Sequence, residues 1–296
     1  MLGVVMTSST APAAPYDPWF LGTPLPLPGT PDGVETATLP FTHFTVVLAP
    51  ERRLAIVTAA NLDGASLVEI DRGDDWHLDP RVPVEAQTGP EVYARNDLDR
   101  GHLTRRRDPV WGERAVAEQA NVDTFSYVNA APQAALFNQG ELLWSGLEDY
   151  VLEHARTYAQ RLTVLTAPVF GDDDPPYRGT RIPRRFWKIA AWNDGDPTDP
   201  VLAATGYVLD QSAQLDAIDL SDPPGATTAA PTLGAYLTYQ VPVVDIATLT
   251  GLDLAPLVAA DRLPVPTTAT PADLRRGAPG LETRWTRLTR ASDVRL

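Results

Sequence analysis

Residues 96–102 read Asn-Asp-Leu-Asp-Arg-Gly-His, and the last four, Asp99-Arg100-Gly101-His102, combine groups that suit chemistry on a phosphate ester. A His is a good general base because its unperturbed pKa lies near neutrality. The guanidinium of Arg100 has a fixed charge and a fork that matches phosphate oxygens. Gly101 lets the backbone turn sharply and approach a substrate closely. The alternative interpretation is a loop with a salt bridge and a surface histidine.

The length and composition predict a soluble protein with a substantial core. A chain of 296 residues, 44% of them hydrophobic and 21% charged, is expected to form one large domain or one domain with extensions. No apolar run approaches the roughly 18 residues that a membrane span needs. The start of the chain has no basic residue before its short apolar patch, which argues against a secretory signal. A mature secreted form would also lack that signal, so the bacterial cytoplasm and secretion both stay open.

The absence of cysteine narrows the chemistry of any site. Disulfides, thiolate zinc sites and cysteine nucleophiles are excluded, because the chain contains no Cys. A bound metal must then be held by oxygen or imidazole, which favours Mg, Mn or Ca. The chain has 4 His, and their spacing gives no indication of a zinc cluster.

The net charge of -14 opposes binding to phosphate, so any face that binds nucleic acid must be locally basic. A candidate for that face is Arg105-Arg106-Arg107, which follows the motif closely and adds to Arg95 and Arg100. Such a patch could hold a backbone phosphate by charge and bidentate hydrogen bonds. A solvated charge run is the alternative interpretation.

Local patterns predict strands and helices without regular alternation. Residues 42–49 and 54–60 are β-branched and apolar around Pro50–Arg53, which predicts a hairpin, and residues 61–64 predict the next turn. Further strands are expected at 125–128, 162–166, 186–192, 201–209 and 236–242, and helices at 113–121, 141–160 and 245–250. Residues 72–100 and 170–185 look irregular. This mixture predicts an α+β domain.

A second group of polar residues follows the motif. Asn129-Ala130-Ala131-Pro132-Gln133 is followed by Asn138 and then by Glu148 on the expected long helix. The amide oxygen of Asn138 is a plausible hard ligand for Mg, which keeps several waters and takes few protein ligands. Glu148 could hold one of those waters. In the alternative interpretation Asn138 caps a helix and Glu148 faces solvent.

Together these segments resemble the DNA/RNA non-specific endonuclease family, the ββα-metal nucleases that include endonuclease G. The family's D-R-G-H motif is intact at 99–102, its N-x-x-P-Q segment matches 129–133, and its metal-ligand Asn and following L-E match Asn138 and 147–148. The resemblance extends to its F-W-K strand at 186–188 and its C-terminal V-P-V and T-G-L segments between 241 and 252. Several ordered motifs are far more specific than any one alone.

The resemblance implies an α+β ββα-metal (His-Me finger) fold with a central mixed or antiparallel sheet flanked by helices. It also implies metal-dependent, sequence-non-specific hydrolysis of DNA and RNA to 5′-phosphate ends, with Mg2+ as cofactor and Mn2+ as a substitute. Expected partners are DNA and RNA, with no membrane, and a homodimer and an inhibitor or immunity protein are further options. The alternatives are a toxin nuclease held by an inhibitor and a nuclease-like domain that binds without cutting.

The resemblance assigns roles to the residues around the motif. His102 would be the general base, Arg100 would stabilise charge on the phosphate, and Asp99 and Asn129 would support the geometry of the site. An additional family arginine matches Arg72, with Arg81 as the competing match.

The resemblance also assigns the metal site, and basic residues around it are expected to contact substrate. Asn138 would be the sole direct protein ligand of a hydrated Mg, and Glu148 would hydrogen-bond a metal water. Lys188, the only lysine among 24 basic residues, would contact substrate together with 105–107. Trp76 and Trp111 are the two tryptophans that we consider for base stacking, because they are close to the motif in sequence.

The expected organisation is an extended arm at 1–38, a nuclease domain at 39–257 and a tail at 258–296. The chain departs from the family pattern at Thr166-Ala167-Pro168, where T-G-P is usual, and in a longer spacing between Asn138 and Glu148. The Pro- and Ala-rich insertion at 215–235 and the tail have no counterpart in the resemblance.

Overall fold

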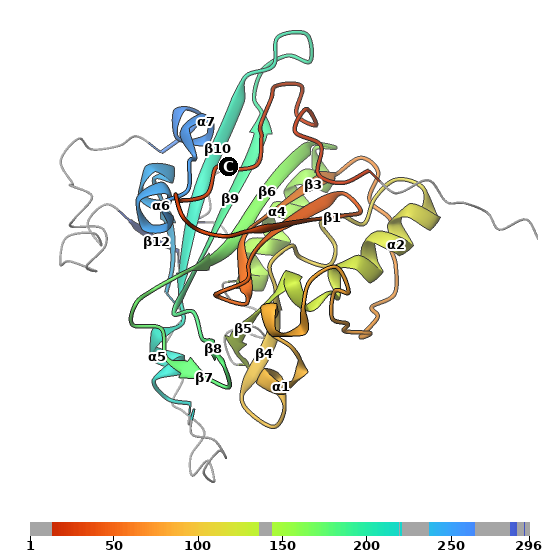
Figure 1. The fold of residues 1–296 in the computed structure, drawn as a ribbon. Helices are drawn as coiled ribbons and strands as arrows, with labels where there is room; N and C mark the ends of the chain where they lie inside the picture. The colour runs from red at the N-terminus through yellow and green to blue at the C-terminus, as the bar shows by residue number, and fades with distance from the viewer. Residues whose placement is uncertain are drawn as a thin grey trace, which may run out of the picture.

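An eight-stranded antiparallel sheet is the centre of the protein, shown by a computed structural model that describes residues 14–135, 144–218, 220, 237–263, 285–288 and 293 (Figure 1). Its strands are, in spatial order, β1 (Ala37–Phe41), β2 (Phe44–Ala49), β3 (Leu54–Asp63), β6 (Arg161–Val169), β9 (Arg185–Asn193), β10 (Leu202–Asp210), β11 (Leu237–Val241) and β12 (Thr286–Leu288). Two small antiparallel pairs are β4 (Leu98–His102) with β5 (Ala130–Ala134), and β7 (Pro176–Tyr177) with β8 (Thr180–Arg181).

The helices are short except for α2 and α4. They are α1 (Pro90–Tyr93), α2 (Arg114–Thr124), α4 (Trp144–Thr157), α5 (Ser212–Leu215), α6 (Val243–Thr250) and α7 (Ala255–Ala259), with 3-10 turns at η1 (Val84–Ala86) and η2 (Tyr127–Asn129). The α+β class with an antiparallel sheet and flanking helices is thereby confirmed.

Both faces of the sheet are covered, which explains why its strands are nearly continuous apolar runs. On one face, Leu103 and Val128 next to the β4–β5 pair, together with Leu152 of α4, pack into a core with the sheet. On the other face the core includes Phe20 of the N-terminal arm and Ile246 of α6. In Figure 1, β4, β5 and α1 gather at one end of the molecule, away from α6 and α7.

The predicted β2–β3 hairpin is confirmed, but β3 runs further than expected. Residues 61–63 pair with residues 161–163 of β6 instead of turning. The chain turns only at Gly64, where the backbone of Ala155 and Gln160 leaves no room for a Cβ. Turn-forming Asn and Asp residues can therefore continue a strand when a neighbouring strand supplies the hydrogen bonds.

The strand predicted at 125–128 is wrong. The backbone amide of Tyr127 donates to the carbonyl of His77, the amide of His77 donates to Phe125, and residues 127–129 form a 3-10 turn. A short apolar run does not by itself distinguish a strand from another buried segment. The irregular segment 170–185 contains the small β7–β8 hairpin, which the sequence did not indicate.

The two ends of the domain extend the sheet and its cover. In the arm, Tyr16, Phe20, Leu21 and Leu25 are buried against the sheet. Residues 286–288, inside the segment expected as a tail, form edge strand β12. Most of the 215–235 insertion lies outside the described residues, and the three-part division of the chain stays a prediction. In the described part of the chain, no helix combines the length and apolar character of a membrane span.

Candidate active site

The β4–β5 pair and helix α4 form a ββα unit that positions His102. His102 ends β4 and lies opposite Ala130, and Gly101 lies opposite Ala131. The side chain of Gln133 crosses Gly101 so closely that a Cβ there would lie 2.1 Å from the Gln133 carboxamide carbon. Glycine is therefore required by space, and it lets the two strands pack with the histidine at their end.

Aromatic side chains enclose the His102 ring. The ring of Trp76 lies 4.7 Å away in a tilted arrangement, and Phe125 makes an edge contact at 5.2 Å. The residue is partly exposed, yet its Nε2 is buried and has no hydrogen-bond partner among the described residues. A buried polar atom without a partner is costly and often marks a functional group.

The surroundings keep the imidazole neutral. Burial, reinforced by nearby guanidinium charges, lowers the pKa of His102 from 6.5 to about 3. In order of effect, these charges belong to Arg72, Arg106, Arg100 and Arg105. At neutral pH, His102 therefore presents an unprotonated ring inside a region of positive potential. A pKa this low makes the ring a weak base, and an anionic phosphate among these arginines would raise the pKa toward neutrality, where a general base is most effective.

Arg100 lies on the same face of β4 as His102, since residues two apart on a strand point the same way. Its guanidinium carbon is 5.1 Å from the centre of the Trp76 ring, and its Nη2 is 3.7 Å from the carboxylate of Asp74. That carboxylate is 73% exposed, so water screens the pair. Trp76 therefore packs against both the candidate base and the adjacent guanidinium.

Of the two candidate upstream arginines, only Arg72 is linked to the site. Arg72 is exposed, and its charge acts on the ring of His102. Arg81 instead forms an ion pair with the buried Asp79, donates to the carbonyl of Pro40 at 2.7 Å and stacks on Phe41. The geometry thus favours Arg72 and gives Arg81 a structural task.

The predicted basic run 105–107 is neither fully solvated nor wholly available to substrate. Arg106 donates to the carbonyl of Ile70 and to the side chain of Asn121, both at 3.0 Å. Arg107 pairs with Glu69 at 3.1 Å. These two arginines fasten the segment that carries Arg72 to the rest of the site, whereas Arg105 is partly buried close to His102.

Asn129 holds the backbone that follows His102. It is fully buried, its amide donates to the carbonyls of Thr104 and Thr124, and its Oδ1 accepts from the amide of Thr104 at 2.9 Å. The backbone carbonyl of Asn129 also accepts from Leu103. With its side chain engaged in this way, Asn129 can position the site but has no free group for substrate.

The contacts that Gln133 and Trp76 make at the site could be recognised only in the three-dimensional structure. Gln133 is fully buried, and neither its Oε1 nor its Nε2 has a hydrogen-bond partner in the described part of the chain. The signal in the sequence was its place in the N-x-x-P-Q segment, although no role was assigned to it. Trp111, the other tryptophan considered for stacking, lies parallel to His43 at 3.5 Å and donates to the carbonyl of Asn61, so it is structural.

The prediction that Lys188 binds substrate needs correction. Its side chain is 1% exposed on β9, between β6 and β10, in a strand whose two faces are both covered. A substrate at the surface cannot reach it there. Asp99 lies opposite Gln133 across the β4–β5 pair and is partly exposed.

The structure describes little of the two proposed metal residues. Asn138 lies outside the described residues, and Glu148 belongs to α4 with its side chain outside the description. Among the described residues, no group of three or more His, Asp or Glu side chains could hold an ion. A cation held mainly by oxygen donors and water, with few protein ligands, is compatible with this donor set and with the unpartnered carboxamide of Gln133.

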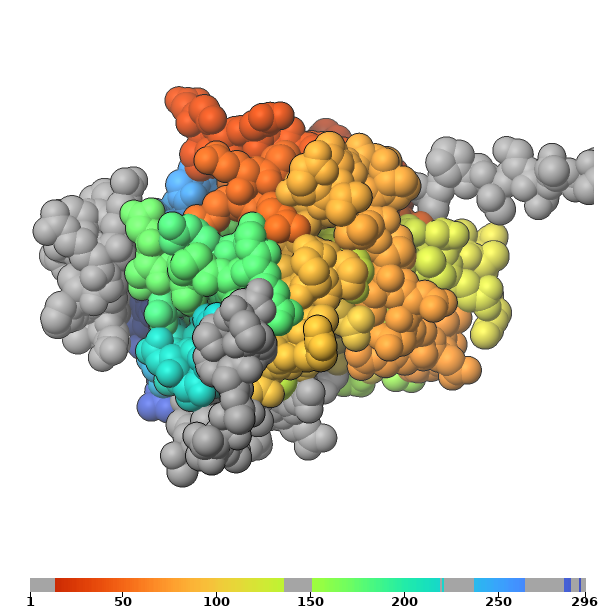
Figure 2. Space-filling view, turned by 60° about the horizontal axis from the view of Figure 1, so that its bottom comes forward, coloured from red at the N-terminus to blue at the C-terminus, as the bar shows by residue number. Residues whose placement is uncertain are grey.

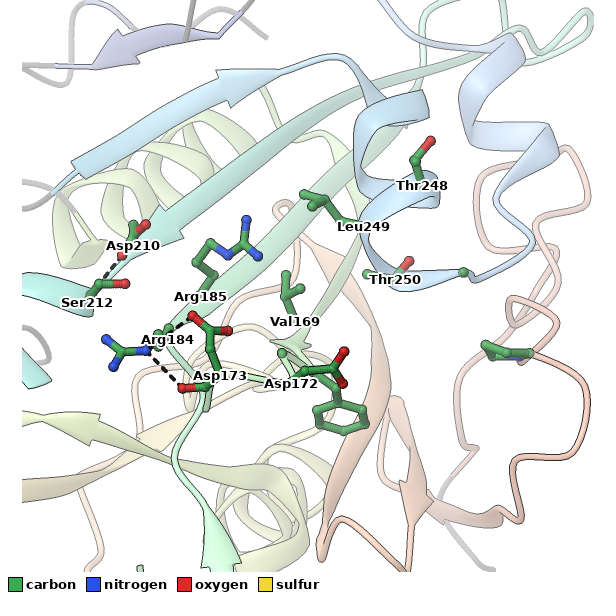
Figure 3. Close-up of a pocket in the computed structure, with 14 residues that line it drawn as sticks. Val169, Asp172, Asp173, Arg184, Arg185, Asp210, Ser212, Thr248, Leu249 and Thr250 are labelled. Atoms are coloured by element: carbon green, nitrogen blue, oxygen red, sulfur yellow. Dashed lines mark hydrogen bonds and ion pairs between the residues drawn. The ribbon is translucent and has the colours of Figure 1, made fainter. Parts of the chain in front are cut away.

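A separate hollow lies between α6 and the ends of β6, β9 and β10 (Figure 3). Its volume is about 680 Å³, and none of the predicted site residues lines it. Within it, Arg184 is 3.6 Å from Asp173, and Asp210 accepts from the backbone of Ser212. The enclosed histidine, and not this hollow, is therefore the candidate active site.

Residues 21–261 match the sequence model of the DNA/RNA non-specific endonucleases. The chain belongs to this family. An uncharacterised protein, y4fB of Sinorhizobium fredii, is 40% identical over 260 residues, which are 83% of this chain and 37% of that protein. The chain thus spans little more than a third of the length of this curated relative.

A solved structure has a fold similar to this member of the family. It is a crystal structure of the EndoG/EndoGI complex, which concerns the mechanism of EndoG inhibition. The TM-score is 0.52 and the identity 18%, with 73% of this chain and 84% of that chain covered. This likeness supports the α+β nuclease fold, and the ββα unit that carries His102 lies inside the matched family segment.

Proposed function

We propose that this chain is a metal-dependent endonuclease that hydrolyses DNA and RNA without regard to sequence, with His102 as the general base. The observation that carries the proposal is the neutral His102, whose buried Nε2 has no partner and is surrounded by arginine charges. Family membership supports the reaction class. The net charge of -14 opposes binding of nucleic acid, but the arginines around His102 create positive potential at the site itself.

In the proposed reaction, the imidazole of His102 accepts a proton from the water that attacks phosphorus. The ring is neutral at physiological pH, so it can take that proton without first losing one. Trp76 and Phe125 fix its orientation. As the bond from phosphorus to the leaving oxygen breaks, that oxygen takes a proton from solvent, while Arg100 and Arg72 stabilise the negative charge on the phosphate oxygens.

Two further groups of residues support this chemistry. Asn129 and Asp99 are positioning residues on the strands that carry the motif, and Arg105 adds to the positive potential. Asn138 and Glu148 are the residues that would hold a hydrated Mg2+, or Mn2+, through oxygen. When bound, such an ion would neutralise phosphate charge and help to supply the attacking water.

The proposed partners are DNA and RNA. An inhibitor protein is a further proposal, supported by the structural likeness to EndoG in a complex that concerns its inhibition. A homodimer stays a proposal as well. For a chain that spans only part of its curated relative, these assignments concern the nuclease segment.

The test is degradation of plasmid DNA and total RNA by purified protein with Mg2+ or Mn2+, against EDTA, beside His102→Ala. His154→Ala is a matched control, since His154 lies on α4 and packs on Tyr158 at 4.6 Å. We expect degradation that needs metal, is lost in His102→Ala and persists in His154→Ala. Equal degradation by His102→Ala would contradict the assignment of the base. Binding of nucleic acid without cutting in any metal would favour the binding-only alternative.

A further inference from the structure

Three arginines occupy the left-handed backbone region, where side chains with a Cβ are disfavoured. Their φ angles are 57° at Arg53, 55° at Arg95 and 43° at Arg178, and the only other such non-glycine residues in the described part are His43 and Ala159. Left-handed backbone costs an L-residue roughly 1–2 kcal/mol, and glycine or asparagine usually takes these positions. Such strain persists where the fold or a ligand needs that side chain.

Two of these arginines are explained by the fold. Arg53 donates to the carbonyls of Gln87 and Gly179 and pairs with Glu91 at 2.8 Å. Arg178 donates to the carbonyls of Glu91 and Ala94 at 2.8 and 2.7 Å. Together they fasten the β2–β3 turn and the β7–β8 hairpin to α1.

Arg95 lies in the same seam, the contact between α1, the β2–β3 turn and the β7–β8 hairpin, but the fold gives no reason for an arginine at this position. Arg95 follows Ala94 directly, is exposed, and forms no side-chain hydrogen bond or ion pair with any described residue. Asn96, next along, donates to the hydroxyl of Tyr177 at 3.0 Å, so the backbone around Arg95 is fixed against the hairpin. A strained, exposed and unpaired guanidinium on a fixed turn is suited to a ligand with negative charge.

This turn leads directly to the candidate base. Leu98 begins β4 and His102 ends it, so the strand spans about 14 Å at roughly 3.4 Å per residue, and Arg95 lies before its start. A duplex advances about 3.4 Å per nucleotide on each strand, so this span corresponds to about four nucleotide steps. Figure 2 shows the hairpin region (green) beside the α1–β4 region (yellow-orange) on one face of the molecule.

A basic groove continues from this seam. It has a volume of about 530 Å³ between the β2–β3 turn and the β7–β8 hairpin, and its charged lining residues are Glu51, Arg52, Arg178 and Arg181. Arg181 uses Nη1 to hold the carbonyls of Asp172 and Asp174, and no carboxylate of a described residue pairs with it. Its positive charge is therefore available to an anionic ligand.

We propose that Arg95, continued by Arg181 in this groove, binds backbone phosphates of the nucleic-acid substrate roughly four or more nucleotide steps away from the bond that is cut. The proposal rests on the nuclease function proposed above. It adds the path that the bound nucleic-acid strand follows over the protein surface away from His102. Contacts to phosphate carry no sequence information, so they fit a substrate bound without regard to sequence.

The experiment measures binding in EDTA, where cutting does not interfere. Fluorescent single-stranded DNA of about 4 and about 16 nucleotides is titrated with wild type, Arg95→Asn, and Arg95→Asn combined with Arg181→Gln. Asparagine tolerates the left-handed backbone, so Arg95→Asn removes the charge without adding strain. Arg114→Gln is the matched control, because Arg114 is an exposed arginine on α2 that pairs only with Glu118.

We expect Arg95→Asn to bind the long strand roughly threefold to tenfold more weakly at low salt and to lower the slope of log K against log salt by about 0.7. The double variant loses more, the short strand is unaffected, and Arg114→Gln binds like wild type. An unchanged midpoint of thermal unfolding shows that the fold is intact. Wild-type affinity of Arg95→Asn for the long strand, or an equal loss in Arg114→Gln, overturns the proposal.

The two proposals fail in different ways. A wild-type protein that binds the long strand but cuts nothing in Mg2+ or Mn2+ overturns the nuclease function, while the comparison of Arg95→Asn with Arg114→Gln still decides the binding path. A wild-type protein that cuts, with no effect of Arg95→Asn or the double variant on binding, overturns the path and leaves the nuclease function in place.

Discussion

The His102 site and the hollow in Figure 3 both collect arginine side chains, but they use the charge in opposite ways. In the hollow, Arg184 lies 2.9 Å from Asp216 and 3.6 Å from Asp173, so its charge is compensated by carboxylates. Around His102 the guanidinium charges act on the ring itself and lower its pKa. The hollow is a defined cavity with arginines on its wall, whereas the guanidinium charges that act on an unpartnered base single out His102.

The largest effect should separate these two regions by activity. His102→Ala removes the proposed base, and we expect kcat to fall by about 10²–10⁴-fold. Arg184→Ala, which removes a compensated charge from the hollow, should leave kcat within about twofold. Initial rates on plasmid DNA in Mg2+ measure both. A comparable fall in Arg184→Ala would mean that the hollow takes part in the reaction.

Arg100 tests whether the guanidinium charge beside His102 contributes to the reaction. Arg100→Ala removes a guanidinium that lies on the same face of β4 as His102, and kcat should fall by about 10²-fold. Arg100→Lys keeps the charge without the fork and should recover part of the loss. The pair of variants is compared by kcat and KM. If Arg100→Ala changes KM alone, the residue binds substrate without stabilising the transition state.

Gly101 tests the packing that places His102. A Cβ at this position would lie 2.1 Å from the side chain of Gln133, so Gly101→Ala should lower the free energy of unfolding by about 1–3 kcal/mol. At Gly73 the nearest atom would be 3.8 Å away, and Gly73→Ala should have little effect. Urea unfolding compares the two. Equal stability of both variants would show that β4 and β5 are less tightly packed than described.

The smallest effect concerns stability against pH. The pKa of His102 is about 3 in the folded protein and about 6.5 when unfolded. Between these values the unfolded chain binds a proton that the folded protein does not, so stability falls as pH drops below 6.5. Between neutral pH and about pH 5 these pKa values correspond to about 2 kcal/mol, so with a discount for the partial exposure of the residue wild type should lose about 1–2 kcal/mol more than His102→Asn. Parallel urea titrations at the two pH values would show identical losses if His102 titrates normally.

The sequence predicted which residues gather at the site better than the local structure that holds them. The D-R-G-H motif singled out His102, but residues 72–100 were expected to be irregular, and the structure places strand β4 at Leu98–His102. The same reasoning misplaced Lys188, since a motif match does not show which side of a strand is covered, and both sides of β9 are. A match to a family motif therefore predicts that a residue contacts substrate only when the exposure of its side chain is also known.

Other features depend on contacts between distant segments. The choice between Arg72 and Arg81 could not be made from spacing, because it depends on Asp79 and Phe41 engaging Arg81. The enclosure of the His102 ring joins Trp76 and Phe125, which lie on separate loops. The strained backbone of Arg95 is likewise invisible in the sequence. Asn138 and Glu148 remain predictions from the family pattern.

The most direct test of the account is the dependence of kcat/KM on pH, which reports the pKa of the essential base in the free enzyme. If the neutral, enclosed His102 is that base, kcat/KM in saturating Mg2+ stays level as pH falls from about 8 to about 5, because the ring is already unprotonated throughout. A loss of activity with a single titration near pH 6.5 would mean that His102 is hydrated and free of the surrounding positive potential, and would contradict the account.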